Sequence, residues 1–154
     1  MTVSLVATSR DQTTWLLEAS TAYFRELGSD QDDLPYAEVV GWFDDPNTHV
    51  LTITRAGRRV GFALVDRFDS YHELCEFCIL TEHRNKGIGT EAVPACFAQF
   101  PGQWSLGVAK ASPGTARFWD RVLQALPGVT ELARGAPLTP YQSHSYTFAY
   151  KGTR

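Results

Sequence analysis

Apolar residues recur along the chain with two different periods, and the change between them divides the sequence into helices and strands. Between Trp15 and Leu27 the apolar positions are three or four residues apart and Gly28 follows, which predicts a helix with a glycine end. From position 49 the spacing shortens toward two, which is typical of strands. The predicted strands cover 2–7, 49–55, 59–66, 71–80, 104–109, 129–133 and 145–150, and the predicted helices cover 10–27, 36–42, 88–100 and 113–126.

This order of elements, β-α-α-β-β-β-α-β-α-β-β, predicts an α/β fold with a mixed sheet and helices on both of its faces. The segment 71–80 is too apolar for a half-exposed strand, so we expect it near the centre of the sheet. No internal repeat or linker interrupts the pattern, and 154 residues are enough to bury one core. We therefore expect a single domain spanning residues 1–154.

Composition and charge narrow the class of protein. Hydrophobic residues make up 44% of the chain, which argues against disorder, and the net charge of -3 does not indicate a nucleic-acid surface. No apolar run approaches the ~18 residues that a membrane span requires. The first residues lack the basic and apolar regions of a secretory signal, so the sequence predicts a cytoplasmic protein with no membrane or nucleic-acid partner.

The three cysteines are Cys75, Cys78 and Cys96, an odd number that argues against a disulfide framework. Cys75 and Cys78 have C-x-x-C spacing, but no second pair or set of histidines completes a metal site, so we expect none. In a regular strand these two side chains would point to opposite faces. We interpret all three as buried apolar residues.

The most informative stretch joins the apolar strand at 71–80 to the helix that follows it. The turn between them carries two cations and two glycines, namely Arg84, Lys86, Gly87 and Gly89. Backbone N–H groups at a helix start, its positive dipole end and two cations would face one way, which suits a phosphate. Pro94 would remove a backbone donor, so we expect either a kink in this helix or a regular start only near Thr90.

At this turn the sequence resembles a known family. The residues from Ile79 to Thr90 resemble the acyl-CoA-binding motif of the GNAT superfamily of N-acetyltransferases, whose core reads Arg/Gln-x-x-Gly-x-Gly/Ala. A second match runs from Ser112 to Trp119, where the family has Asn-x-x-Ala-x-x-Leu/Phe-Tyr/Trp. The stretch 76–126 is similar to a branch of predicted acetyltransferases within this superfamily.

The resemblance implies a GNAT-type fold, with a mixed, mostly antiparallel central sheet of about six or seven strands flanked by helices on both faces. It also implies an N-acetyltransferase that moves an acetyl group from acetyl-CoA to a primary amine by direct attack in a ternary complex. The acceptor would be a small-molecule or peptide amine. The residues that would bind acetyl-CoA are Ile79, Leu80, Arg84, Asn85, Lys86, Gly87, Ile88, Gly89, Thr90, Ser112 and Trp119.

Within this interpretation, the N–H groups from Arg84 to Gly89 would bind the pyrophosphate, and Ile79 would pair through its backbone with the pantetheine arm. An N–H group at Ile79 or Leu80 would polarise the thioester carbonyl. An amine with a pKa of ~10 is mostly protonated at neutral pH, so a base must take its proton. Glu73 and Glu76 are the candidates.

A regular pleat would place Glu73 and Glu76 on opposite faces, unless a bulge changes the parity. Register within the family favours Glu73, whereas Glu76 lies closer to the turn. A strand carboxylate can equally be an edge or ion-paired residue with no catalytic role. The alternatives stay open at this point.

Two departures from the family pattern affect the expected mechanism. The family's frequent tyrosine acid falls on Trp119, whose indole cannot supply a proton. The acid role is therefore vacant or unnecessary, since thiolate is a fair leaving group, or it is taken by Tyr141, Tyr146 or water. Ser112 replaces the family's asparagine. The alternative function is therefore a non-catalytic acyl-CoA-binding module.

Two further features concern partners. An acidic loop at 30–33, together with Asp44 and Asp45, lies where the superfamily builds its acceptor pocket and would suit a cationic amine, although such a run is more often a solvated loop. The apolar C-terminal strand at 146–150 could serve as the edge of a homodimer.

Overall fold

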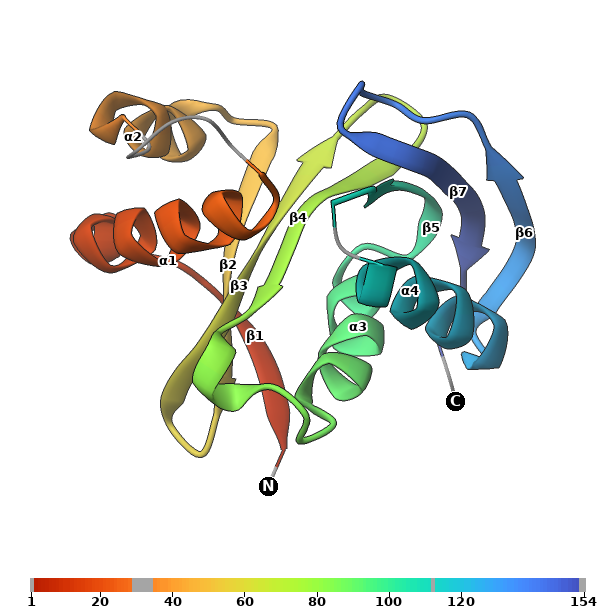
Figure 1. The fold of residues 1–154 in the computed structure, drawn as a ribbon, viewed down its shortest axis with the longest axis horizontal. Coiled ribbons are helices and arrows are strands. Elements are labelled where there is room, and N and C mark those ends of the chain that lie inside the picture. Colours follow the sequence, from red (N-terminus) through yellow and green to blue (C-terminus); the bar gives the residue numbers. More distant parts are fainter. Residues whose placement is uncertain (1, 29–34, 112, 153–154) are drawn as a thin grey trace.

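The fold, seen in a computed structural model that describes residues 2–28, 35–111 and 113–152, is one seven-stranded sheet with helices on both faces (Figure 1). The spatial order of the strands is β1-β2-β3-β4-β5-β7-β6. The strands are β1 (Val3–Ala7), β2 (Thr48–Arg55), β3 (Arg58–Arg67), β4 (His72–Ile79), β5 (Gly102–Ala109), β6 (Val129–Gly135) and β7 (Gln142–Tyr150). The helices are α1 (Thr13–Glu26), α2 (Tyr36–Asp44), α3 (Ile88–Gln99) and α4 (Pro113–Ala125). The predicted order of elements and the position of β4 at the centre are confirmed.

The helices form two layers because two sets of apolar side chains leave the sheet in opposite directions. On one face, α1 and α2 bury Leu16 and Val39 against Phe62 of β3. On the other face, α3 and α4 bury residues such as Phe97 and Leu123 in the larger core cluster. The fully buried aromatic and branched side chains of these clusters are the apolar positions that define the periods in the sequence.

The sheet opens between β4 and β5. Neighbouring strands are antiparallel everywhere else, but β4 and β5 are parallel and pair only at His72–Leu74 with Trp104–Leu106. Beyond these three pairs β4 continues to Ile79 and β5 to Ala109 without mutual pairing, and the two ribbons diverge (Figure 1). Part of the backbone of the central strand is therefore left without a strand neighbour on one side.

A β-bulge interrupts β4 at Cys75. Leu64 of β3 pairs with Glu76 and Val65 pairs with Leu74, so Cys75 is an extra residue with no partner on β3. One extra residue changes the alternation of side chains by one position.

Glu73 and Glu76 therefore lie on the same face of the sheet, toward α1 and α2, and the expectation for a regular pleat does not apply. The same bulge corrects the expectation for the cysteines, because Cys75 and Cys78 both contact the core cluster on that face. Cys78 and Cys96 are buried, as predicted, whereas Cys75 is only partly buried, and all three are free thiols.

Helix α3 begins at Ile88, so the expected regular start near Thr90 is wrong. Gly87 is the N-cap, with a left-handed φ of 78°, and the turn before it is fixed by Asn85 with φ of 62°. The conformation of this turn sets the helix start, and Pro94 is accommodated inside the helix.

Strand β7 does not lie at an edge of the sheet. It pairs with β5 on one side and with β6 on the other, so the expected dimer edge at 146–150 is wrong. The outer strands are β1 and β6. None of the helices in the described ranges is long and apolar enough to cross a membrane.

Candidate active site

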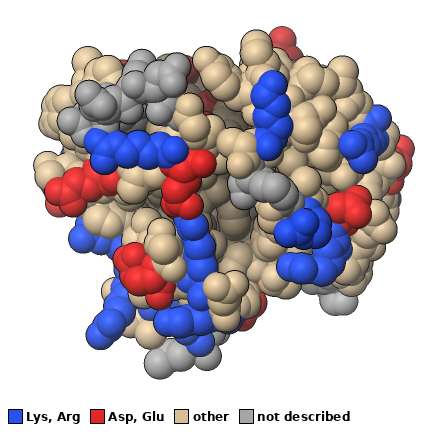
Figure 2. Space-filling view, in the orientation of Figure 1, with Lys and Arg blue, Asp and Glu red and all other residues tan. Residues whose placement is uncertain are grey.

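Two adjoining cavities, each of about 700 Å³, lie where β4 and β5 diverge. Side chains from α1, β4 and α4 form the wall that both cavities share, and they are Tyr23, Leu27, Phe77, Thr115 and Trp119. The surface is hollowed between the part of the molecule that carries α1 and the part that carries α4 (Figure 2). We call the cavity beside residues 83–90 the turn-side cavity and the one beside Glu73 and Glu76 the carboxylate cavity.

The turn-side cavity is bounded by the N-terminus of α3. The first intrahelical bond runs from the Glu91 N–H to the Gly87 carbonyl, so the N–H groups of Ile88, Gly89 and Thr90 precede the helical ladder. Gly87 has no side chain that could cap them. These N–H groups and the helix dipole therefore suit an anion at this cavity wall.

Gly89 brings α3 close to α4. A Cβ atom at this position would lie 3.3 Å from the ring of Phe118 and 3.7 Å from Ile79. The first distance is tighter than ordinary van der Waals contact, so a side chain here would displace the ring or narrow the cavity. This glycine keeps the backbone at the helix start accessible.

The two cations of the turn do not both face the cavity, contrary to the expectation from sequence. Arg84 lines it, but its guanidinium is bound by Glu26 at 2.7 and 2.9 Å and donates to the Ile79 carbonyl at 2.8 Å. Lys86 is exposed, is not part of the described cavity wall, and has its Nζ 3.5 Å from the Glu82 carbonyl. Arg84 therefore ties the end of β4 to α1 more than it presents a free charge.

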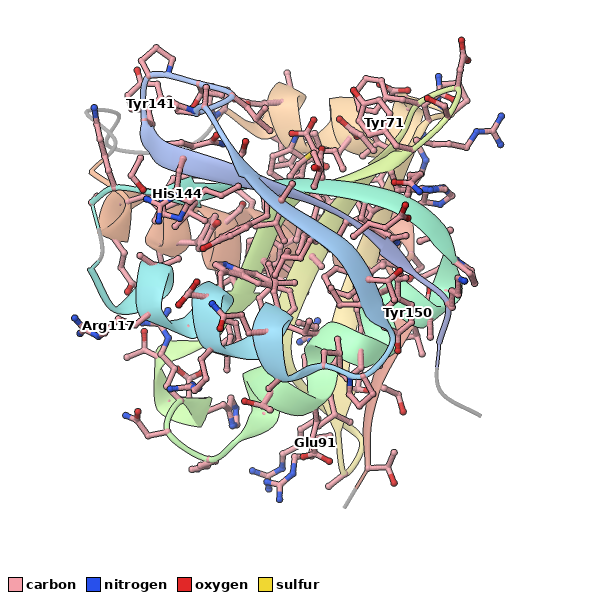
Figure 3. All side chains as sticks on the ribbon, turned by 90° about the vertical axis from the view of Figure 1, so that its right-hand side faces the viewer. Tyr71, Glu91, Arg117, Tyr141, His144 and Tyr150 are labelled. Carbon is pink, nitrogen blue, oxygen red and sulfur yellow. The ribbon has the colours of Figure 1, made fainter. Side chains whose placement is uncertain are left out.

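Other cations contribute to this wall. Arg121 of α4 lines the turn-side cavity, as does His83, and the guanidinium of Arg121 lies 6.0 Å from the ring centroid of Phe118. Sequence reasoning missed Arg121 because it lies just beyond Trp119, where the second motif ends. Its neighbour Arg117 projects outward from α4 (Figure 3).

Backbone groups of β4 face the gap left by β5. The Leu80 N–H donates to the Val60 carbonyl at 2.8 Å, which identifies these residues as a hydrogen-bonded pair. Because alternate residues of a strand direct their backbone groups to opposite sides, Phe77 and Ile79 direct theirs away from β3, toward the gap. The Leu80 N–H is thus occupied. The N–H groups on the open side of β4 belong to Phe77 and Ile79, and that of Phe77 bonds to Tyr23.

The carboxylate cavity carries a concentration of negative charge. Glu38 of α2 lines it together with Glu73 and Glu76 of β4, and no lysine or arginine belongs to its wall within the described ranges. Residues 107–109 of β5 and residues 139–142 before and at the start of β7 form the opposite side. Such a wall favours a positively charged occupant.

Glu76 is the more perturbed of the two strand carboxylates. Its pKa is raised to about 7, chiefly by burial and with smaller contributions from the charges of Glu73 and Glu38, while a hydrogen bond from Tyr23 opposes the rise. The Tyr23 hydroxyl donates to Glu76 Oε1 at 3.1 Å. A carboxyl group with this pKa changes its charge near neutral pH, where a general base is most effective.

Glu73 lies further from the turn-side cavity and lines only the carboxylate cavity. Its pKa is raised by burial and by the charge of Asp66, while a hydrogen bond involving Cys75 opposes this. The bulge at Cys75 thus brings both carboxylates to one cavity, but Glu76 is the one bonded to a residue of the shared wall.

The tyrosines that sequence analysis offered in place of Trp119 lie in different surroundings. The Tyr146 hydroxyl donates to Asp120 at 3.1 Å, and Tyr146 lines neither cavity. Tyr141 lines the carboxylate cavity but is 74% exposed and projects at the end of the molecule beside the start of β7 (Figure 3). Trp119 is buried, packs its ring 5.5 Å from that of Phe77, and lines both cavities.

The remaining predicted positions are less informative. Ser112 and the acidic loop at 30–33 lie outside the described residues. Asp44 binds Arg10, and Asp45 accepts a hydrogen bond from the Asn47 N–H at 2.8 Å, so neither contributes to the described cavity walls. Tyr23 is recognisable in the sequence only as an apolar position of α1, and its role as a partner of Glu76 depends on contacts between distant segments.

Comparisons with known proteins agree with this geometry. The sequence model of the acetyltransferase (GNAT) family matches residues 13–123. An acetyltransferase from Thermus thermophilus has a similar structure, with a TM-score of 0.72 and 17% identity over 96% of each chain. A search of curated proteins finds no significant match.

Two further similar structures contain ligands. AAC(6')-Ib bound to ribostamycin and coenzyme A superposes with a TM-score of 0.75 and 14% identity over 98% of this chain and 94% of the other. Spermidine N-acetyltransferase from Vibrio cholerae, in complex with CoA and spermine, has a TM-score of 0.68 and 12% identity over 97% and 94%. These similarities establish the fold, and the family match covers most of the chain, so the protein belongs to the acetyltransferase (GNAT) family.

Proposed function

We propose that this acetyltransferase transfers the acetyl group of acetyl-CoA to a primary amine on a small cationic molecule, by direct attack of the amine on the thioester. The observation that carries the proposal is the shared wall between the turn-side and carboxylate cavities. An acyl donor in the first cavity and an amine in the second would meet at Phe77 and Trp119, beside Glu76.

In this proposal the turn-side cavity holds the donor. The N–H groups from Asn85 to Thr90 would bind the pyrophosphate, with Lys86 contributing its backbone and Arg121 adding a positive charge, whereas the Arg84 N–H already donates to the Thr81 carbonyl. The open backbone groups of Ile79 would pair with the pantetheine arm as an added strand would. Leu80 would serve only to position β4, because its N–H is occupied.

The carboxylate cavity supports a cationic acceptor. Three carboxylates and no cation among its described wall residues would attract an ammonium group and disfavour an acidic amine such as an amino acid. Two of the similar structures hold spermine and ribostamycin, both in acetyltransferases. A molecule with more than one ammonium group could use Glu38 and Glu73 while its reacting amine approaches Glu76.

We assign the base to Glu76 in preference to Glu73, which the sequence pattern slightly favours. Both carboxylates line only the carboxylate cavity, but Glu76 is the one bonded to Tyr23 in the shared wall. Ionised Glu76 would remove a proton from the ammonium, and the free amine would then attack the thioester carbonyl. The Ile79 N–H on the open side of β4 would stabilise the developing oxyanion, because the Phe77 N–H bonds to Tyr23.

The test combines acetyl-CoA with three acceptors of similar length: 1,4-diaminobutane, n-butylamine and 4-aminobutyrate. Released coenzyme A is followed with a thiol reagent, and a reaction without acceptor corrects for hydrolysis. We expect kcat/KM to fall in the order diamine, monoamine, amino acid. Preference for the amino acid would contradict the cationic acceptor, and fold stabilisation by acetyl-CoA without thiol release from any amine would favour the binding module instead.

A further inference from the structure

The geometry points to Tyr23 as the residue that supplies a proton to the departing coenzyme A sulfur, with Glu76 replacing that proton, so that the two side chains form a relay from acceptor to donor. This inference rests on the proposed function. It assigns to a helix α1 residue the role that Trp119 of α4 cannot perform, because indole N–H is not an acid of useful strength.

Tyr23 occupies the position that such a relay requires. It belongs to both cavity walls, whereas Glu76 belongs only to the carboxylate cavity. Of the five described residues common to both walls, it alone has an acidic side chain, since the others are Leu27, Phe77, Thr115 and Trp119. Its hydroxyl is 3.1 Å from Glu76 Oε1, within reach of direct proton transfer.

The hydrogen bond between the two residues depends on the charge of Glu76. Ionised Glu76 can only accept, so the Tyr23 proton points toward it. Once Glu76 has taken a proton from the ammonium, its O–H can donate to the Tyr23 oxygen. The Tyr23 proton is then free to turn toward the turn-side cavity, so it becomes available only after the acceptor has been deprotonated.

Protons and electron pairs balance over the complete reaction. Glu76 takes one proton from the ammonium, and the nitrogen lone pair forms the N–C bond while the carbonyl π pair moves to oxygen. When that pair reforms the carbonyl, the C–S bond breaks with its electrons on sulfur, sulfur takes the Tyr23 proton, and Tyr23 takes the proton held by Glu76. The N-protonated amide then loses its remaining proton through ionised Glu76 to water, leaving amide, thiol and one released proton.

The surroundings of Tyr23 match this sequence of events. Its pKa is raised well above its ordinary value by burial, then by the negative charge of Glu76, then by Cys78, and by the hydrogen bond to Glu76. The two Glu76 contributions disappear when Glu76 is protonated, which makes Tyr23 a stronger acid at the moment its proton is required. A hydrogen bond from the Phe77 backbone lowers the pKa and would stabilise a transient tyrosinate.

The other tyrosines do not meet these conditions. Tyr146 is bonded to Asp120 outside both cavities, and Tyr141 lines only the carboxylate cavity. Tyr146 therefore provides a matched control, because Tyr146→Phe removes one buried tyrosine hydroxyl from the same protein without touching either cavity wall.

The experiment compares Tyr23→Phe and Tyr146→Phe with the wild type, using the best amine and saturating acetyl-CoA across pH 5.5 to about 9. A thermal shift with acetyl-CoA first verifies that each variant folds and binds the donor. We expect Tyr23→Phe to lower kcat on its high-pH plateau by about 100-fold or more, the size typical of a lost general acid. The acidic limb of the plot of kcat against pH, where the rate falls as Glu76 becomes protonated, should also move to higher pH. The lost hydrogen bond had lowered the pKa of Glu76.

Two results would overturn the relay. If the high-pH plateau of kcat for Tyr23→Phe lies within about threefold of wild type, and only the acidic limb is displaced, Tyr23 is a positioning residue for Glu76. If the fold-loss in kcat of the double variant Tyr23→Phe/Glu76→Gln equals the product of the two single fold-losses, the two residues act independently. In a relay, removing both residues costs little more activity than removing one. Absence of thiol release by the wild type itself would instead contradict the proposed function.

Discussion

Replacing Glu76 by glutamine is expected to abolish most activity and, at alkaline pH, to stabilise the protein. Folding raises the pKa of this carboxyl from 4.5 to about 7, chiefly through burial. The native state therefore keeps a proton between these pH values that the unfolded chain has already released. Below pH 4.5 the carboxyl is protonated in both states, so it does not lower the free energy of unfolding. As pH rises from 4.5 to about 7, the free energy of unfolding falls.

The magnitude follows from the difference between the two pKa values. About 2.5 pH units at about 1.4 kcal/mol each give at most about 3.5 kcal/mol, which the wild type loses as pH rises from 4.5 to about 7. Glutamine has the same shape, carries no charge and can still accept the Tyr23 hydrogen bond, so the variant avoids this loss. For a chain of this length, 1 kcal/mol corresponds to a Tm change of about 2–4 °C. We therefore expect Tm to rise by up to about 14 °C at pH 8 and to stay unchanged at pH 4, below the ordinary pKa of a glutamate.

The assay is thermal unfolding of wild type and Glu76→Gln at pH 4 and pH 8, paired with the thiol-release rate at pH 8. The rate should fall by about 100-fold or more if Glu76 is the base. Glu82→Gln is the control, since Glu82 is an exposed residue of the same chain segment. An equal Tm difference at both pH values would show that the burial argument is wrong, and retention of the acidic limb in the Glu76→Gln rate profile would show that another group is the base.

Three shorter predictions follow from the cavity walls. Glu38→Gln should move the acidic limb of kcat/KM to lower pH, because its charge raises the pKa of the base, and should raise KM for a diamine more than for n-butylamine. Gly89→Ala should raise KM for acetyl-CoA about tenfold or more, since its Cβ would lie 3.3 Å from an aromatic ring, whereas Gly41→Ala on α2 meets no atom within 4 Å and should match wild type. A double-mutant cycle on Glu26 and Arg84 should give a coupling below about 1 kcal/mol, because these side chains are 46% and 36% exposed, and a much larger value would contradict this surface assignment.

The elements of the fold could be predicted because each is determined by local periodicity. The helix ended by Gly28, the apolar strand at 71–80 and the glycine turn before α3 are each defined by neighbouring residues in the sequence. The position of β7 inside the sheet could not be predicted in this way. It depends on β6 returning outside β7, a choice between edges that no local pattern records.

The sequence predicts the glycine turn of the site well, but it does not identify all the residues that contribute to the site's chemistry. Gly87 and Gly89 are recognisable in sequence because their small size is needed at the position where they occur. The partner of Arg84 is not recognisable, since Glu26 lies 58 residues away along the chain and meets it only through the packing of α1. In the sequence, Tyr23 is one of several apolar positions of a predicted helix. Only the 3.1 Å hydrogen bond from its hydroxyl to Glu76 distinguishes it from the other positions.

Two irregularities of the central strand explain why the chemistry gathers where it does. Loss of pairing with β5 after Leu74 exposes the backbone of Phe77 and Ile79, and the bulge at Cys75 turns Glu73 to the same face as Glu76. A regular, fully paired β4 would have neither an open edge for an acyl donor nor two carboxylates facing one amine. The missing pairing with β5 leaves backbone groups of β4 without strand partners, which a ligand can bind. The bulge places two carboxylates in one cavity, where they can take a proton. The stability that β4 gives up in pairing and in burying Glu76 is thus the source of the site's reactivity, which is why Glu76→Gln is expected to recover stability while losing function.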